Sequence, residues 1–450
     1  MAHPPAALPP DAEPIFRLGR AIAQTLADAG HEAWFVGGCV RDRVMGLPLH
    51  DLDLATSAPP AVLARLFPRA VQAGAHFGVF LVRENGVEVQ VATYRTESSY
   101  LDGRRPAEVR FETDVRRDVE RRDFTINSLL ENPWTGEIVD FCGGLADIGG
   151  RIIRAIGEPS KRFAEDHLRL LRGVRFAARL GFHIEPATFA AMRRSAPLIR
   201  RTAPERVRDE LVRMLTEGAA RRAFQLLDET GLLEVILPEV ARMKGVPQPP
   251  EHHPEGDVWV HTLLLLEQLQ NPAPALALAA LLHDVGKPAT FQVTDRIRFN
   301  GHDQVGAAMA RRILARLRFP GEIAGTAAEL VAQHMRFADA LKMRESTFKR
   351  FARQPLFPLL LELYRMDKLA GNRDLTKYNE VLRRWRSIPP DEYRPAPLLS
   401  GHDLLALGVP RGPLVGRLLA GLEDEQLEGR LNSRQEAEAW VRQALERETT

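Results

Sequence analysis

The sequence predicts an α+β protein in which a small mixed β-sheet is followed by helical domains. Between residues 15 and 150, short apolar runs alternate with amphipathic stretches, as in strands interleaved with helices. Asn85-Gly86 separates two apolar runs, which is a strong short signal for a β-hairpin. Beyond residue 150, apolar residues recur mainly at helical spacing. In chain order we expect a disordered tail (1–14), a mixed head (15–150), a helical neck (151–245), a third, helical domain (246–390) and a helical tail (391–450).

Composition restricts the class of protein. A chain of 450 residues can form more than one core, and 45% hydrophobic with 27% charged residues is typical of a folded globular protein. The formal net charge of +2 indicates no global attraction to nucleic acid, so an RNA-binding surface must be local and DNA is not expected as a partner. The two cysteines predict neither a disulfide framework nor a metal motif. With no signal peptide pattern and no apolar run of membrane-spanning length, we expect a cytoplasmic protein without membrane contact.

The head begins with an amphipathic helix and a strand that ends at a glycine pair. The helix has one apolar face, formed by Ile15, Leu18, Ile22 and Leu26. The apolar run 33–36 then breaks at Gly37-Gly38, where exposed backbone N–H groups ahead of a helix can close on a phosphate.

A pair of aspartates follows the glycine pair. If Asp51-Leu52-Asp53-Leu54 is a strand, its period of two places both carboxylates on one face. Two carboxylates held close together repel each other, and a divalent cation between them offsets this repulsion. Magnesium is typically bound by one or two carboxylates of this kind. Taken singly, each feature favours an ordinary βαβ unit with surface aspartates. Together, at this spacing, they favour a site for a nucleotide and a metal ion.

These residues carry a resemblance to a known family. Gly37-Gly38-Cys39-Val40-Arg41-Asp42, Met45-Gly46, Asp51-Leu52-Asp53 and Thr56 resemble the head of the class II tRNA nucleotidyltransferases, which include the CCA-adding enzymes and the bacterial poly(A) polymerases. The resemblance implies that Asp51 and Asp53 are catalytic and hold two Mg²⁺ ions. It also implies that Gly37, Gly38 and Arg41 bind the triphosphate.

One position departs from the family pattern. The family carries a third acidic residue just before a segment that Val91-Ala92-Thr93-Tyr94-Arg95-Thr96 matches, but Gln90 stands there. Glu88, two residues earlier and therefore on the same strand face, offers a carboxylate as a substitute metal ligand. The polar stretch 97–106 is expected to be a mobile loop, which in the family helps the site switch between nucleotides.

A second motif of the head resembles the family's Arg-Arg-Asp…Asn pattern. It reads Arg121-Arg122-Asp123-Phe124-Thr125-Ile126-Asn127-Ser128. Arginine offers bidentate contacts to phosphate oxygens, so Arg122 is predicted to bind the triphosphate. Asp123 and Asn127 are predicted to hold a ribose hydroxyl. For Arg121 alone, a solvated helix start is the better interpretation.

The neck is predicted to select the base. One helix is expected to contain residues 165–175, with Asp166, Arg169 and Arg172 on one stripe. A charge stripe is by itself typical of an exposed, salt-bridged helix. The resemblance instead implies that Asp166 and Arg169 read the Watson–Crick edge of the incoming base, while Arg172 and Arg175 hold the nucleotide. Arginines between residues 193 and 213 are a plausible phosphate-binding stripe for the tRNA acceptor stem.

The third domain carries a second set of reactive side chains. An adjacent His-Asp pair at the end of an apolar helix is a poor core choice, because both need partners when buried. The pair resembles the HD phosphohydrolase superfamily, which implies the metal ligands His261, His283, Asp284 and Asp367, with His302 and His334 as extra ligands of two-metal members. Imidazole and carboxylate ligands suit Mn, Fe, Ni, Zn or Mg, so the metal stays open. An inert structural HD domain is the alternative.

The sequence therefore predicts a template-independent tRNA nucleotidyltransferase that adds CCA to the tRNA 3′ end from CTP and ATP, with Mg²⁺ and release of pyrophosphate. Within this class, CC-only, A-only and poly(A)-adding enzymes share the motifs. A different hypothesis is an HD phosphohydrolase on an RNA-binding scaffold whose polymerase head Gln90 has impaired. A third is a non-catalytic RNA-binding protein, against which the Asp51/Asp53 pair argues.

Overall fold

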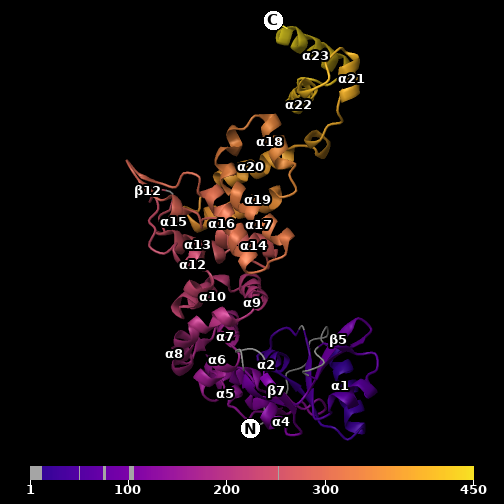
Figure 1. The fold of residues 1–450 in the computed structure, drawn as a ribbon, viewed down its shortest axis with the longest axis vertical. Coiled ribbons are helices and arrows are strands. Elements are labelled where there is room, and N and C mark those ends of the chain that lie inside the picture. Colours follow the sequence, from indigo (N-terminus) through magenta and orange to yellow (C-terminus); the bar gives the residue numbers. More distant parts are fainter. Residues whose placement is uncertain (1–12, 50, 74–77, 101–105, 252, 450) are drawn as a thin grey trace. The chain divides into compact units, whose positions relative to one another are not determined.

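A computed structural model describes residues 13–49, 51–73, 78–100, 106–251 and 253–449 (Figure 1). The chain separates into two compact units that divide between Ala241 and Arg242. The predicted tail residues 1–12 lie outside the described residues, whereas Glu13 and Pro14, also assigned to that tail, already form the first turn of helix α1. Within the described residues, no helix is both long and apolar enough to cross a lipid bilayer.

The described part of the head contains a seven-stranded mixed sheet in the order β3-β4-β5-β2-β1-β8-β9. Its strands are β1 Ala33–Val36, β2 Asp53–Thr56, β3 Val71–Gln72, β4 Val79–Glu84, β5 Val87–Thr93, β8 Leu130–Glu131 and β9 Ile138–Val139. Strands β2 and β5 pair in parallel and the other neighbours are antiparallel. The predicted turn is confirmed, since Asn85 and Gly86 have the positive φ angles (50° and 78°) that a tight hairpin requires.

Helices cover the sheet and bury its apolar side chains. They are α1 Glu13–Asp28, α2 Gly38–Val44, α3 Pro60–Leu66, α4 Val115–Glu120 and α5 Gly144–Gly150. Helix α1 packs Phe16, Ile22 and Leu26 into one core with Leu54 and Val91 of the sheet, as the helical spacing predicts. The prediction of a loop over residues 97–106 is wrong for its ends, because β6 (Arg95–Tyr100) and β7 (Pro106–Phe111) pair antiparallel. Residues 101–105 lie outside the described residues.

The rest of the first unit is mainly helical. It contains α6 Pro159–Glu165, α7 Arg169–Leu180, α8 Pro186–Ser195, α9 Pro204–Thr216, α10 Ala220–Glu229, α11 Leu232–Ile236 and α12 Pro238–Ala241, with the short pair β10 Ile152–Ile153 and β11 His183–Ile184. The expectation of one helix through residues 165–175 is wrong. Asp166 is extended (φ −139°, ψ 107°) and separates α6 from α7. Its carboxylate accepts the Leu168 backbone N–H at 3.1 Å, a local bond that competes with helix continuation.

The described part of the second unit is mainly helical and contains one hairpin of two short strands, β12 Gln292–Val293 and β13 Ile297–Arg298. Its α-helices are α13 Val258–Leu266, α14 Pro274–Leu282, α15 Lys287–Thr290, α16 His302–Arg316, α17 Gly321–Gln333, α18 Glu345–Ala352, α19 Phe357–Ala370, α20 Thr376–Ser387, α21 Gly401–Ala406, α22 Pro413–Leu427 and α23 Arg434–Thr449. A 3₁₀ segment, η5 His334–Lys342, continues α17. Helices α21–α23 form a small apolar cluster of their own. They attach to α18, where Arg350 and Arg353 both bond Glu423 at 2.7 Å.

Candidate functional site

In the head, the end of β1 and the start of β2 bring a glycine, a carboxylate and an arginine together. Val36 pairs with Asp53 in the antiparallel register, so Gly37 follows directly beside this aspartate. Gly37 has φ 80°, and a Cβ there would lie 3.2 Å from Arg122 Nη1 and 3.6 Å from Asp53 Oδ2. A side chain at this position would thus be strained and would crowd both groups. Glycine at this position therefore leaves the space beside Arg122 and Asp53 unfilled.

The two aspartates lie as the alternation predicts. Leu52 and Leu54 are buried, Asp51 is exposed and Asp53 is partly buried, although the strand itself begins only at Asp53. Burial, and then repulsion from Asp51, raise the pKa of Asp53 to about 6, and nearby arginines offset the shift only in part. A divalent cation would relieve this repulsion, so the pair fits such an ion.

The third acidic position of the family falls directly beside this pair. Gln90 is the register partner of Asp53 in the parallel β2–β5 pair, so both side chains lie on the same sheet face. Glu88 shares that face but forms an exposed ion pair with Arg83, its partner across the hairpin. The predicted use of Glu88 as a metal ligand would require this ion pair to open.

Four residues predicted to bind nucleotide form one chain of hydrogen bonds. Arg41 Nη1 donates to Asn127 Oδ1 at 2.5 Å, and Asn127 Nδ2 donates to Asp123 Oδ1 at 3.1 Å. Arg172 Nε donates to Asp123 Oδ2 at 2.7 Å. Burial opposes ionisation of Asp123, but the Arg172 guanidinium outweighs it and holds the pKa of that carboxyl below its usual range. Arg41 is only 2% exposed, so it would bind a triphosphate only after exchanging protein partners.

The predicted base-reading pair is not assembled as a pair. Both oxygens of Asp166 accept from Arg206, at 3.0 and 2.8 Å. Arg169 instead donates to the Arg121 backbone carbonyl at 2.8 Å and pairs with Glu165. The prediction that these residues share one helical stripe is therefore wrong, because the helix is interrupted at Asp166.

Arg175, predicted to hold the nucleotide, also has a protein partner. Its Nε donates to Glu210 Oε2 at 2.7 Å, and both side chains are buried. Its guanidinium lies 4.4 Å from the Phe176 ring centroid. In the described structure Arg175 thus holds α7 against α9.

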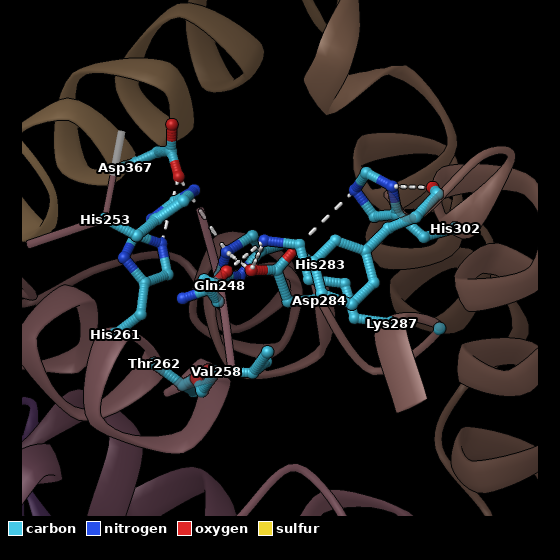
Figure 2. Close-up of polar contacts among 12 residues, drawn as sticks. Gln248, His253, Val258, His261, Thr262, His283, Asp284, Lys287, His302 and Asp367 are labelled. Atoms are coloured by element: carbon cyan, nitrogen blue, oxygen red, sulfur yellow. Dashed lines mark hydrogen bonds and ion pairs between the residues drawn. The ribbon is translucent and has the colours of Figure 1, made fainter. Parts of the chain in front are cut away.

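In the second unit, the six predicted HD residues converge. His261 lies on α13, the His283-Asp284 pair follows α14, and Asp367 lies on α19 (Figure 2). His302 begins α16 and His334 begins η5. Their potential ligand atoms form two groups, each within 4.8 Å: His261, His283 and Asp367, then Asp284, His302 and His334.

Hydrogen bonds orient the imidazoles toward this cluster. His283, His302 and His334 each place Nδ1 at 2.7–3.0 Å from the backbone carbonyl three residues earlier. Because a carbonyl only accepts, Nδ1 carries a proton in each ring, and Nε2 is the nitrogen that faces the cluster and can ligate a metal. The Nε2 atoms of His302 and His334 lie 3.2 Å apart. Nε2 of His283 is buried and lies 3.2 Å from Asp284 Oδ2. Nε2 atoms that converge beside a carboxylate in this way fit a divalent metal.

The carboxylates of the cluster are charged. Burial disfavours the ionised form of Asp284, but His283 and Lys287 outweigh it and hold the pKa of that carboxyl well below its usual range. Lys287 lies 2.7 Å from Asp284 Oδ2 and donates to Gln248 Oε1 at 2.5 Å. Burial lowers the pKa of His334 to about 4, which keeps its imidazole neutral and able to ligate.

The sequence analysis missed three side chains beside this cluster, Gln248, His253 and Glu255. His253, Glu255 and His261 form a further group of potential ligand atoms within 4.8 Å. The signal was available in the sequence, since His253 and Glu255 immediately precede the helix that carries His261. His252 lies outside the described residues.

Comparisons with known proteins agree with the fold of both domains. Three family models match: the poly A polymerase head domain over residues 33–154, the probable RNA and SrmB-binding site of polymerase A over 181–244, and the HD domain over 257–372. The fold and the sites thus define a nucleotidyltransferase head joined to an HD domain.

One relative matches nearly the whole chain. A CC-adding tRNA nucleotidyltransferase of Thermus thermophilus is 37% identical over 91% of this chain and 93% of its own. The chain belongs to the family of tRNA nucleotidyltransferases and poly(A) polymerases.

Other relatives match over part of their length or by structure. A CCA-adding enzyme of Limosilactobacillus fermentum is 43% identical over 48% of this chain, and the match spans 54% of that relative. The crystal structure of the Bacillus stearothermophilus CCA-adding enzyme in complex with CTP is 27% identical, with a TM-score of 0.73 over 97% of this chain and 99% of that chain.

Proposed function

We propose that this protein is a template-independent tRNA nucleotidyltransferase that adds CCA to the tRNA 3′ end from CTP and ATP. The convergence of Gly37, Asp53 and Arg122 at the end of β1 carries the proposal. The family membership and the similarity to a CCA-adding enzyme in complex with CTP support it. CC-only addition is the second candidate, because the relative that matches nearly the whole chain is a CC-adding enzyme.

Asp51 and Asp53 would hold two Mg²⁺ ions with the triphosphate. When bound, these ions would activate the RNA 3′-hydroxyl for attack on the α-phosphate and stabilise the leaving pyrophosphate. Gly37 has no side chain, so space for the triphosphate remains beside Asp53. Arg122 would supply positive charge at the same place. Asp166 and Arg169 would select the base. Arg206 would hold the Asp166 carboxylate in place, because each of its oxygens keeps a second lone pair that can accept from the base.

The neck would bind the acceptor stem of tRNA. Arg193, Arg194, Arg200, Arg201 and Arg213 are exposed there, and such cations neutralise RNA phosphates. The protein would act in the cytoplasm, where tRNA is processed.

We infer that the HD cluster is a metal-dependent phosphohydrolase centre. The Nδ1 bonds of His283, His302 and His334, which leave each Nε2 facing inward, carry this inference. A metal held there would lower the pKa of a bound water and make it a nucleophile for phosphoester hydrolysis.

One assay separates these functions. A tRNA transcript lacking its 3′ CCA is incubated with Mg²⁺ and CTP, ATP or both, beside the Asp53→Ala variant, and products are separated at single-nucleotide resolution. Growth by CCA that then stops, and is absent in the variant, is the expected result. Addition of C alone would move the assignment to CC-adding, and no extension would refute the polymerase proposal. Hydrolysis of a 2′,3′-cyclic phosphate, lost in Asp284→Ala, tests the HD centre.

A further inference from the structure

His261 differs from the other three histidines of the HD cluster in where it lies on its helix. His283, His302 and His334 stand at helix ends, and each bonds the carbonyl three residues earlier through Nδ1. His261 is the fourth residue of the nine-residue helix α13. Its Nδ1 bonds a carboxylate instead of a backbone carbonyl.

The carbonyls preceding His261 already have donors. The Asp257 carbonyl accepts the His261 backbone N–H at 3.1 Å. The Val258 carbonyl accepts the Thr262 hydroxyl at 2.8 Å (Figure 2). The ring orientation that the other three histidines obtain from a backbone carbonyl comes here from a side chain.

Glu255 supplies that orientation. Its Oε1 lies 2.6 Å from His261 Nδ1, and Nε2 on the other side of the ring lies 3.0 Å from Asp367 Oδ1. The imidazole is fully buried and the Glu255 side chain is 6% exposed, so solvent screens this pair little. The same Oε1 lies 2.9 Å from His253 Nδ1, so a second imidazole also holds the carboxylate.

We propose that Glu255 is the positioning residue of the metal centre: it holds the His261 ring so that Nε2 faces the metal and raises the basicity of that nitrogen. The inference rests on the proposed HD metal centre. A hydrogen-bond acceptor behind a metal-bound imidazole fixes the tautomer and raises the basicity of the ligand, and the full charge of a carboxylate does so more strongly than the dipole of a carbonyl. His261 would therefore contribute more to affinity than His283, which bonds a carbonyl.

The test titrates the full-length protein with Co²⁺ alone. Binding is followed by calorimetry, and the visible spectrum of the bound ion reports its coordination. Glu255→Gln keeps the size of the side chain but loses its charge. Glu251→Gln, an exposed carboxylate in the same segment, is the matched control. We expect Glu255→Gln to bind the same number of ions about 10- to 100-fold more weakly, with a changed spectrum, and Glu251→Gln to match the parent protein.

Three results would overturn the inference. Unchanged affinity and spectrum in Glu255→Gln would show that the carboxylate does not act on the centre. Loss of one whole equivalent of bound Co²⁺ in Glu255→Gln would show that Glu255 is itself a metal ligand. A parent protein that takes up no Co²⁺ would refute the metal centre itself, which distinguishes that failure from the first two. The unfolding midpoint without metal confirms that each variant is folded, and Glu255→Ala repeats the comparison if the Gln variant does not fold.

Discussion

The head and the HD domain both carry acidic residues suited to metal ions, but they balance the charge in opposite ways. In the head, burial and Asp51 raise the pKa of Asp53 to about 6, and the neighbouring Gln90 adds no charge. In the HD cluster, His283 and Lys287 hold Asp284 ionised without a metal. A carboxylate pair that repels favours a transient ion arriving with the nucleotide. A cluster with oriented imidazoles and balanced charge favours a resident metal.

The largest expected effect comes from Asp53 itself. Asp53→Asn keeps the side-chain volume and removes the charge that the proposed Mg²⁺ ions require. We expect nucleotide incorporation to fall by at least about 10²–10³-fold, the size of loss seen when a main electrostatic contact to the transition state is removed. Repulsion from Asp51 also disappears, so the unfolding midpoint should stay equal or rise. Co²⁺ uptake by the HD cluster serves as the internal control, and an active Asp53→Asn protein would contradict the assignment.

The same substitution in the HD domain should have the opposite effect on stability. Asp284→Asn leaves the buried Lys287 without its ion partner, although Gln248 still accepts one bond. Breaking a buried pair from one side costs about 3–5 kcal/mol, so we expect a lower unfolding midpoint in calorimetry as well as lost metal binding. The double variant Asp284→Asn/Lys287→Met should recover much of the stability but no metal binding. Equal stability of the two variants would argue against this charge balance.

A smaller effect is expected in the neck, where Arg206 holds both oxygens of Asp166. Arg206→Gln would leave Asp166 free to turn, and a well-placed polar pair contributes about 1–3 kcal/mol to base discrimination. We expect misincorporation from GTP and UTP to rise by roughly 10-fold, measured in single-turnover reactions with one nucleotide at a time. Arg208→Gln, on the same helix, is the matched control. If both variants retain the parent's selectivity, Arg206 has no part in positioning Asp166.

Sequence patterns predict those structural features that depend on residues close together in the sequence. Asn85-Gly86 requires positive φ angles, and the Leu52/Leu54 alternation follows from burying one strand face. Both features could therefore be predicted without tertiary contacts. The resemblance singled out the six HD residues, and the structure brings them together, while their role as metal ligands stays a prediction. The partner of Asp166 could not be predicted, because Arg206 lies 40 residues away and only the packing of α9 brings it there.

The smallest effect concerns the third acidic position. Because Glu88 pairs with Arg83 at an exposed site and Gln90 lies beside Asp53, the two positions should respond differently. Gln90→Glu should lower the Mg²⁺ concentration for half-maximal incorporation by a few fold, since one more carboxylate strengthens a site for a hard cation. Glu88→Gln should change it little, because an exposed ion pair contributes at most about 1 kcal/mol and the carboxylate already has a partner. A clear rise in the Mg²⁺ requirement of Glu88→Gln would instead show that Glu88 leaves Arg83 and replaces the missing acid. The head would then complete its charge only when the metal arrives, which would sharpen its contrast with the HD cluster.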